Sequence, residues 1–236
     1  MTTNAAYVVD FDGTVTTKDL SSELAAFFGG TEFMEIENRY RNREIPIKIW
    51  LQSIAKSLPR DMDILLAKAL QWTEIRPGFD SFLDHAIEQD SQVFIASDGF
   101  GFYIEPILEE YNLLHKVDYI YRNDTFVDGH GKLQVVTPHA HSVCTVCGNC
   151  KAAHVLDLKE KGIPVIYIGD GSNDRFGASW SDYICPRDQL EKICKENDFN
   201  YSPWFDFYDI IKVKSPSLQD RSAISFCSPR GNGIKV

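Results

Sequence analysis

The chain has 236 residues, of which 44% are hydrophobic and 25% are charged, as in ordinary globular proteins. Its 24 basic and 34 acidic residues give a net charge of −10, and no basic cluster of the kind found in nucleic-acid-binding proteins is present. No apolar stretch approaches the length of a membrane span, and the first residues lack the features of a signal peptide. We therefore expect no nucleic-acid partner, no membrane partner and a cytoplasmic location.

The first predicted strand, residues 5–9, is a short apolar stretch that runs into Asp10-Phe11-Asp12-Gly13-Thr14. In open α/β sheets, ligands bind at the carboxyl ends of the strands, where Asp10 and Asp12 would stand. A loop after the strand can aim the two carboxylates differently, so that one attacks a phosphorus atom while the other transfers a proton. An acidic turn without a catalytic role is the alternative interpretation.

Residues 16–73 are predicted to be helical, because apolar residues recur at helical spacing and no convincing strand pattern is present. The first of four helices ends at Gly29-Gly30, and Asp61 can cap the last one. We interpret this stretch as a small helical cap inserted after the first strand.

Helices and strands alternate beyond residue 74. The predicted elements are a helix at 79–87, a strand at 92–96, a helix at 100–114, a strand at 117–121, a hairpin at 125–136, a helix at 151–161, a strand at 164–168, a helix through residue 178 and a strand at 183–185. This alternation predicts an α/β fold with a doubly wound, Rossmann-like parallel sheet and a helical cap. The expected division is a core of residues 1–15 and 74–214, a cap of residues 16–73 and an irregular tail of residues 215–236.

Three of the predicted buried strands end in polar residues that suit phosphate chemistry: Asp10 and Asp12, Ser97-Asp98-Gly99, and Asp170 with Asp174. Lys151 stands at a predicted helix start, and the tips of parallel strands converge, so these groups can form one site. Several carboxylates in one place repel one another unless a cation lies among them, and Mg²⁺ is the natural cation where the substrate is a phosphate. Lys151, Ser97 and nearby N–H groups can then bind the phosphate oxygens.

With these motifs in this order, the chain resembles the haloacid dehalogenase superfamily of phosphatases over residues 6–212. The resemblance implies that Asp10 is the nucleophile and Asp12 the general acid and base. It further implies that Ser97, Asp98, Gly99 and Lys151 bind the phosphate of the substrate. Mg²⁺ would be held by Asp10, the backbone carbonyl of Asp12 and Asp170, with Asp174 supporting the metal or Lys151.

Within the superfamily, the chain is most similar to the phosphoserine-phosphatase-like branch, and more narrowly to methionine-salvage enol-phosphate phosphatases and to phosphocholine/phosphoethanolamine phosphatases. Residues 147–151, together with 187–188 and 206–210, carry this narrower resemblance. Phosphoserine phosphatases grip their substrate with a cap glutamate and a cap arginine. Here Asp19 stands near the first position and residues 50–58 hold no arginine, so phosphoserine is not the expected substrate. Asp98 also replaces a glycine that is usual in the second motif.

Three cysteines, Cys144, Cys147 and Cys150, lie close to His139 and immediately before Lys151. Three thiolates and a histidine can complete a tetrahedral zinc site. The alternatives are redox-active thiols and cysteines that merely pack in the core.

The sequence therefore predicts a Mg²⁺-dependent phosphatase that acts on a small phosphorylated metabolite. A phosphotransferase would use the same motifs and differ only in the acceptor. A metal- or redox-responsive binding protein that works through the Cys144–Cys150 cluster is the alternative of another class. No feature of the sequence indicates the oligomeric state.

Overall fold

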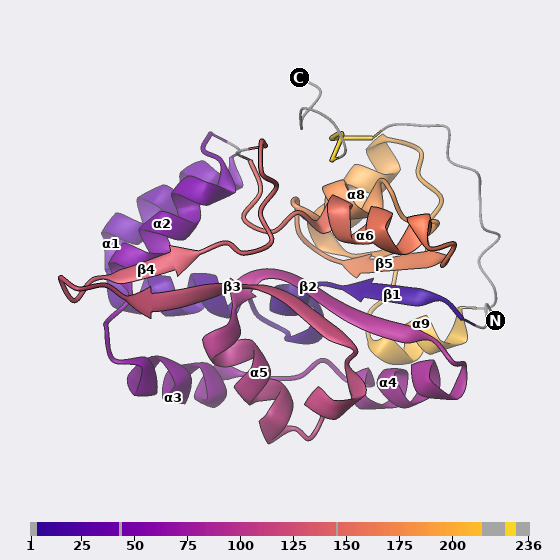
Figure 1. Ribbon diagram of the computed structural model, residues 1–236, viewed down its shortest axis with the longest axis horizontal. Coiled ribbons are helices and arrows are strands. Elements are labelled where there is room, and N and C mark those ends of the chain that lie inside the picture. Colours follow the sequence, from indigo (N-terminus) through magenta and orange to yellow (C-terminus); the bar gives the residue numbers. More distant parts are fainter. Residues whose placement is uncertain (1–3, 43, 145, 214–224, 230–236) are drawn as a thin grey trace.

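A six-stranded sheet with the order β4-β3-β2-β1-β5-β6 forms the centre of the protein, shown as a computed structural model in Figure 1. The structure describes residues 4–42, 44–144, 146–213 and 225–229. Strand β4 runs antiparallel to β3, and the other strands are parallel. The strands are β1 (Ala6–Val9), β2 (Gln92–Phe100), β3 (Tyr119–Val127), β4 (Leu133–Val136), β5 (Val165–Gly169) and β6 (Tyr183–Pro186). The predicted doubly wound α/β fold is confirmed.

The chain changes direction across the sheet at β1, which lies between β2 and β5. Val9 pairs with Ile95 on one side and with Ile168 on the other. The residues that follow these three positions therefore lie next to one another at the carboxyl edge of the sheet. In doubly wound sheets this switch point is where a ligand-binding crevice forms.

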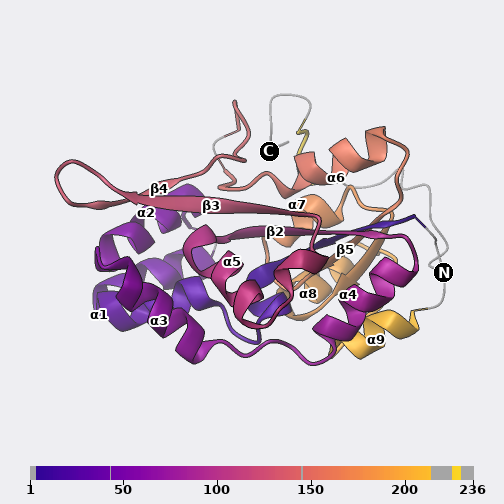
Figure 2. The ribbon, with the colours of Figure 1, turned by 60° about the horizontal axis from the view of Figure 1, so that its bottom comes forward.

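Helices cover both faces of the sheet (Figures 1 and 2). One face carries α4 (Phe79–Glu88), α5 (Gly101–Glu110) and α9 (Phe207–Lys212), and the other carries α6 (Lys151–Glu160), α7 (Asp174–Ala178) and α8 (Asp188–Glu196). Because successive strand residues face opposite sides, Val9 packs in one apolar core while Val8 packs in the other. A tight loop at Phe11–Val15, in which Asp12 and Gly13 have non-helical backbone angles, and a short 3₁₀ helix at Leu114–Lys116 complete this part.

Three helices are inserted between β1 and α4: α1 (Leu20–Arg41), α2 (Ile47–Ser57) and α3 (Met62–Trp72). They gather at the end of the molecule toward which β1 points (Figure 1). Gly30 interrupts α1 with φ of 56° and ψ of −141°, which matches the predicted break between two helices. The predicted cap of α3 is also confirmed, because the Asp61 carboxylate accepts the backbone N–H groups of Asp63 and Ile64.

Two strand predictions need correction. Strand β2 continues to Phe100, so Ser97, Asp98 and Gly99 lie inside the strand rather than after it, where its register with β3 shifts. The strands expected at 117–121 and 125–127 are one strand, because pairing with β4 extends β3 to Val127.

The irregular tail expected at residues 215–236 falls mostly outside the described residues, of which only 225–229 belong to it. In that segment, Cys227 is buried against Cys147 and Cys150. Among the helices that the structure describes, none is long and apolar enough to cross a membrane.

Gly78 begins α4 with φ of 83°, and a Cβ atom there would lie 2.8 Å from the backbone nitrogen of Tyr208 on α9. We expect Gly78→Ala to lower the free energy of unfolding by roughly 1–3 kcal/mol, because both the left-handed backbone and the contact resist a side chain. Gly129→Ala, where a Cβ atom would meet nothing within 4 Å, is the control and should change stability by less than about 0.5 kcal/mol. Urea denaturation measures the stability of both variants. Equal denaturation midpoints for Gly78→Ala and Gly129→Ala would contradict this explanation.

Candidate active site

A buried lysine lies between two aspartates at the switch point. Lys151, at the start of α6, is 3% exposed, and its Nζ lies 2.8 Å from Asp10 Oδ2 and 2.6 Å from Asp174 Oδ1. Burial alone would lower the pKa of Lys151, but Asp10 and Asp174 outweigh it and raise this pKa well above its usual value. Lys151 is therefore a fixed positive charge beside Asp10.

Asp174 is fully buried, and its carboxylate is occupied by hydrogen bonds. Oδ1 accepts the Tyr167 hydroxyl at 2.7 Å in addition to Lys151. Oδ2 accepts the backbone N–H groups of Asp170 at 3.0 Å and Gly171 at 2.8 Å. These partners indicate that Asp174 orients Lys151 and the loop after β5, which is one of the two roles expected from the sequence.

Asp170 lies across from Asp10, where Thr14 Oγ1 donates a hydrogen bond of 2.6 Å to its Oδ1. A Cβ atom at Gly13, whose φ is 76°, would lie 2.5 Å from Asp170 Oδ2. Glycine is therefore needed at position 13 for backbone conformation and for space. Arg76 holds this loop by donating to the backbone oxygens of Thr14 at 2.8 Å and Gly13 at 2.6 Å.

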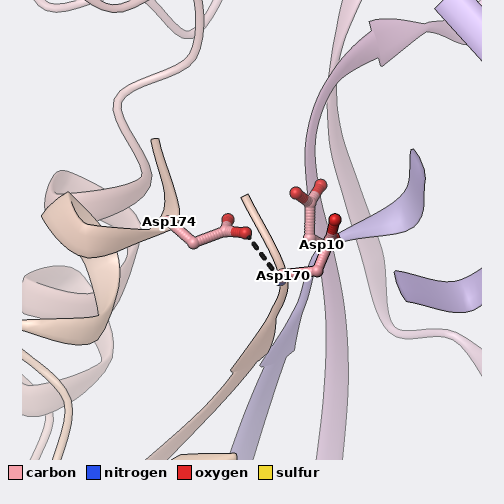
Figure 3. A group of neighbouring side chains, drawn as sticks. All are labelled: Asp10, Asp170 and Asp174. Atoms are coloured by element: carbon pink, nitrogen blue, oxygen red, sulfur yellow. Dashed lines mark hydrogen bonds between the residues drawn. The ribbon is translucent and has the colours of Figure 1, made fainter. Parts of the chain in front are cut away.

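Asp10, Asp170 and Asp174 each offer a carboxylate oxygen within 4.8 Å of the others. Figure 3 shows the Asp10 and Asp170 carboxylates side by side at neighbouring strand tips, with Asp174 reaching toward them from α7. Burial, with Asp174 next in importance, raises the pKa of Asp10 well above its usual value and that of Asp170 to about 7. Such oxygen ligands fit a hard divalent cation such as Mg²⁺, which would relieve their repulsion.

The Asp12 carboxylate points to the start of α1 and to α5. Its Oδ1 accepts the backbone N–H of Leu20 at 3.1 Å, and its Oδ2 accepts the hydroxyl of Tyr103. Burial, followed by the charge of Asp19, raises the pKa of Asp12 well above its usual value. A carboxyl group with a raised pKa is suited to giving and taking a proton near neutral pH.

Ser97 and Asp98 complete the core side of the site. Ser97 is 1% exposed, and its Oγ accepts the backbone N–H of Gly99 at 2.9 Å. The Asp98 carboxylate accepts the backbone N–H of Asn149 at 3.0 Å and the side-chain amide of Asn173 at 3.2 Å. The extra carboxylate of the second motif is thus held by two asparagines, which join the loops before α6 and α7.

These groups line a cavity of about 440 Å³ whose outer wall comes from the inserted helices. Tyr40 and Trp50 stack there with ring centroids 4.8 Å apart. Glu37 accepts Trp50 Nε1 and Arg41 Nε, both at 2.6 Å. An arginine therefore does reach the cavity, but from position 41 and paired with Glu37. Asp19 also lines the cavity, and within the described ranges it forms no salt bridge.

The structure does not bring the possible zinc ligands together closely enough to hold a metal; these are Cys144, Cys147, Cys150 and His139. Among the residues that the structure describes, the three aspartates are the only such group of His, Cys, Asp or Glu side chains close enough to hold a metal. The His139 ring instead packs edge-on against Tyr121 and His154, with centroids 5.2 and 5.6 Å away. Cys147 and Cys150 lie in an apolar cluster with Cys227, where burial raises the pKa of Cys227 to about 11. This geometry supports the packing alternative.

Several residues that build the site were not identified from the sequence. Asn149 donates through its side-chain amide to the backbone oxygens of Ser97 and Tyr121, both at 2.8 Å, and its Oδ1 lies 2.6 Å from His154 Nε2. Position 149 lies within the stretch that carried the narrower resemblance, and this was its only signal. No sequence pattern indicated a role in the site for Arg76, Tyr103 or Tyr167, because their partners are distant in sequence or were not recognised.

Comparison with known proteins agrees with this geometry. The sequence model of the family described as Putative Phosphatase matches residues 5–200. The chain is 29% identical over 203 residues to the 2-hydroxy-3-keto-5-methylthiopentenyl-1-phosphate phosphatase of Bacillus cereus. The aligned region covers 85% of this chain and 91% of that protein. The enzyme of the same name from Bacillus thuringiensis is 29% identical over 204 residues, with the same coverage.

Solved structures of phosphoserine phosphatase share the fold. A phospho-aspartyl intermediate analogue of that enzyme matches with a TM-score of 0.70 at 19% identity, covering 91% of this chain and 100% of that one. A substrate-bound phosphoserine phosphatase matches with a TM-score of 0.69 at 17% identity and the same coverage.

We expect Mg²⁺ to bind roughly tenfold more weakly at pH 6 than at pH 8, because a carboxyl group with a pKa of about 7 is mostly protonated at the lower pH. Calorimetric titration of the metal-free protein with MgCl₂ measures this difference. Asp170→Asn is the control and should bind Mg²⁺ weakly at both pH values. Equal affinity of the unaltered protein at pH 6 and pH 8 would contradict the assignment.

Proposed function

The chain belongs to the Putative Phosphatase family of haloacid dehalogenase-like phosphatases, and we propose that it hydrolyses a small phosphorylated metabolite through an aspartyl-phosphate. The observation that carries this mechanism is the placement of Asp10, a buried carboxylate 2.8 Å from the fixed charge of Lys151, at the base of the cavity. Lys151 stabilises both the ionised nucleophile and the negative charge of the phosphate.

In the proposed reaction, an Asp10 oxygen attacks phosphorus and the bond from phosphorus to the leaving oxygen breaks. Asp12 gives its proton to that oxygen, and the alcohol leaves. A water molecule then attacks the phosphorus of the aspartyl-phosphate, and the Asp12 carboxylate takes the proton of that water. Inorganic phosphate leaves and Asp10 is restored.

Ser97 and the N–H groups near Gly99 would bind phosphate oxygens, whereas Asp98 would hold Asn149 and Asn173 in place. Asp10, Asp170 and the backbone carbonyl of Asp12 would hold Mg²⁺, with Asp174 supporting Lys151. The ion, when bound, neutralises charge on the phosphate and orients it for in-line attack.

We further propose that helices α1–α3, within residues 16–73, act as a cap over a core formed by residues 1–15 and 74–214. These helices supply the outer wall of the cavity, including Tyr40 and Trp50. A cap that closes over the substrate would exclude bulk water during transfer of the phosphoryl group.

For the substrate, the 29% identity to the Bacillus enzymes supports the methionine-salvage enol phosphate that their name describes. A second candidate is a phosphate ester with an ammonium group, such as phosphocholine or phosphoethanolamine. The side of the cavity formed by the inserted helices favours it, because Asp19 lines the cavity without a salt bridge among the described residues and the aromatic rings of Tyr40 and Trp50 lie on the same side.

The test is phosphate release from a panel of esters with Mg²⁺: the methionine-salvage enol phosphate, phosphocholine, phosphoethanolamine, phosphoserine and pyridoxal phosphate. We expect release from at least one ester, and Asp10→Asn should lower that rate by roughly 10⁴-fold or more, because the nucleophile is lost. Undiminished activity of Asp10→Asn would contradict the proposed mechanism. Transfer of phosphate to an added alcohol, followed in the same assay, would identify a phosphotransferase.

Asp19→Asn distinguishes the two substrate candidates. If the substrate carries an ammonium group, we expect KM for that ester to rise roughly tenfold, because a charge-assisted contact is weakened. The enol phosphate has no cation, so its KM should change little. Lys18→Gln, at the exposed neighbouring position, is the control for a change of charge near the cavity mouth.

A further inference from the structure

Tyr103 is a fully buried tyrosine on α5. Its hydroxyl donates a hydrogen bond to Asp12 Oδ2. Ser21 Oγ, on the first turn of α1, lies 2.8 Å from the Tyr103 oxygen and 3.4 Å from Asp12 Oδ2. The Ser21 hydroxyl donates to Asp12 Oδ2 and also lies within hydrogen-bond distance of the Tyr103 hydroxyl, so the three side chains form one hydrogen-bonded cluster.

The two oxygens of the Asp12 carboxylate are held from different parts of the fold. Oδ2 is held by Tyr103 of the sheet-covering helix α5, and Oδ1 is held by the backbone N–H of Leu20 in the inserted helix α1, at 3.1 Å. Two hydrogen bonds from opposite sides fix the plane of a carboxylate, which a single hydrogen bond leaves free to rotate.

Gly99 provides the space for this contact. A Cβ atom at Gly99 would lie 2.2 Å from the Tyr103 hydroxyl oxygen, 2.5 Å from Asp12 Oδ2 and 3.0 Å from Ser97 Oγ. Any side chain at position 99 would therefore push the tyrosine and the aspartate apart. The end of β2, the hydroxyl of Tyr103 and Asp12 fit together as one unit.

We propose that Tyr103 is a positioning residue for acid–base catalysis, whose hydroxyl orients the Asp12 carboxyl group toward the leaving-group oxygen. Ser21 of α1 contacts both side chains, so the orientation of Asp12 also depends on the position of α1. This inference rests on the proposed function, in which Asp12 protonates the leaving oxygen. Tyr103 is not among the residues that line the cavity, and its hydroxyl contacts the side chains of Asp12 and Ser21. Its effect therefore depends on how much the leaving group needs a proton.

The test compares Tyr103→Phe with the unaltered enzyme on two kinds of ester. An alkyl phosphate, the best one from the panel, must receive a proton as its bond to phosphorus breaks. p-Nitrophenyl phosphate releases a stable phenolate and needs none. We expect Tyr103→Phe to lower the single-turnover rate for the alkyl ester by roughly 10–100-fold, because part of the acid–base contribution is lost. The burst of p-nitrophenolate should change less than about threefold.

Tyr183→Phe is the matched control. Its hydroxyl lies 2.7 Å from Ser202 Oγ, it is also buried, and it is not among the residues that line the cavity. The control should leave both rates unchanged. Ser21→Ala is a second variant that keeps the phenol, and it should show the same selectivity for the alkyl ester with a smaller loss.

If Tyr103→Phe lowers the rates for both esters equally, or lowers neither rate, the inference is overturned. If Tyr103→Phe unfolds, the decision falls to Ser21→Ala, and the same rate loss on both esters in that variant, or no loss, also overturns the inference. A parent enzyme that releases no phosphate from any ester, or that works equally well as Asp10→Asn, would overturn the proposed function and this inference with it. A loss of rate confined to the alkyl ester supports both the proposed function and the role of Tyr103.

Discussion

The structure depends on a buried lysine that needs two carboxylates. Lys151 is 3% exposed, and a lone ammonium in such a place would be strongly destabilised. Asp10 and Asp174 make its burial tolerable, and they bring the tips of β1 and β5 and the start of α6 to one point. The same arrangement leaves Asp10 and Asp170 with raised pKa values and a need for a further cation. The ion pair that stabilises the site therefore also prepares it for a metal and a phosphate.

The topology explains why these residues can meet at all. Asp10 and Asp170 follow neighbouring parallel strands, and Lys151 begins the helix that leads into β5. Asparagine side chains then join the loops: Asn149 links the segment before α6 to β2 and β3, and Asn173 reaches Asp98. Because these hydrogen bonds join groups far apart in sequence, the site requires that β1, β2, β3 and β5 have come together.

The sequence was informative where a functional residue directly follows a strand. Asp10, Asp12, Asp170 and Lys151 stand beside strongly apolar or helical stretches, so both their elements and their meeting point were predictable. It was uninformative where a contact depends on tertiary packing. Tyr103 looks like any core aromatic on a helix face, and its contact with Asp12 spans 91 positions. The zinc alternative shows the same limit, because sequence proximity suggested His139 as a partner of the cysteines, whereas packing places its ring against Tyr121 and His154.

In the proposed reaction, Asp10 carries the phosphoryl group. The most direct measurement is rapid acid quenching of the enzyme during turnover, followed by mass spectrometry of its peptides. We expect an acid-stable addition of one phosphoryl group on the peptide that contains Asp10, formed with Mg²⁺ and substrate and absent when substrate is omitted. Turnover without any phosphorylated peptide, or with the phosphoryl group on a peptide that lacks Asp10, would contradict it.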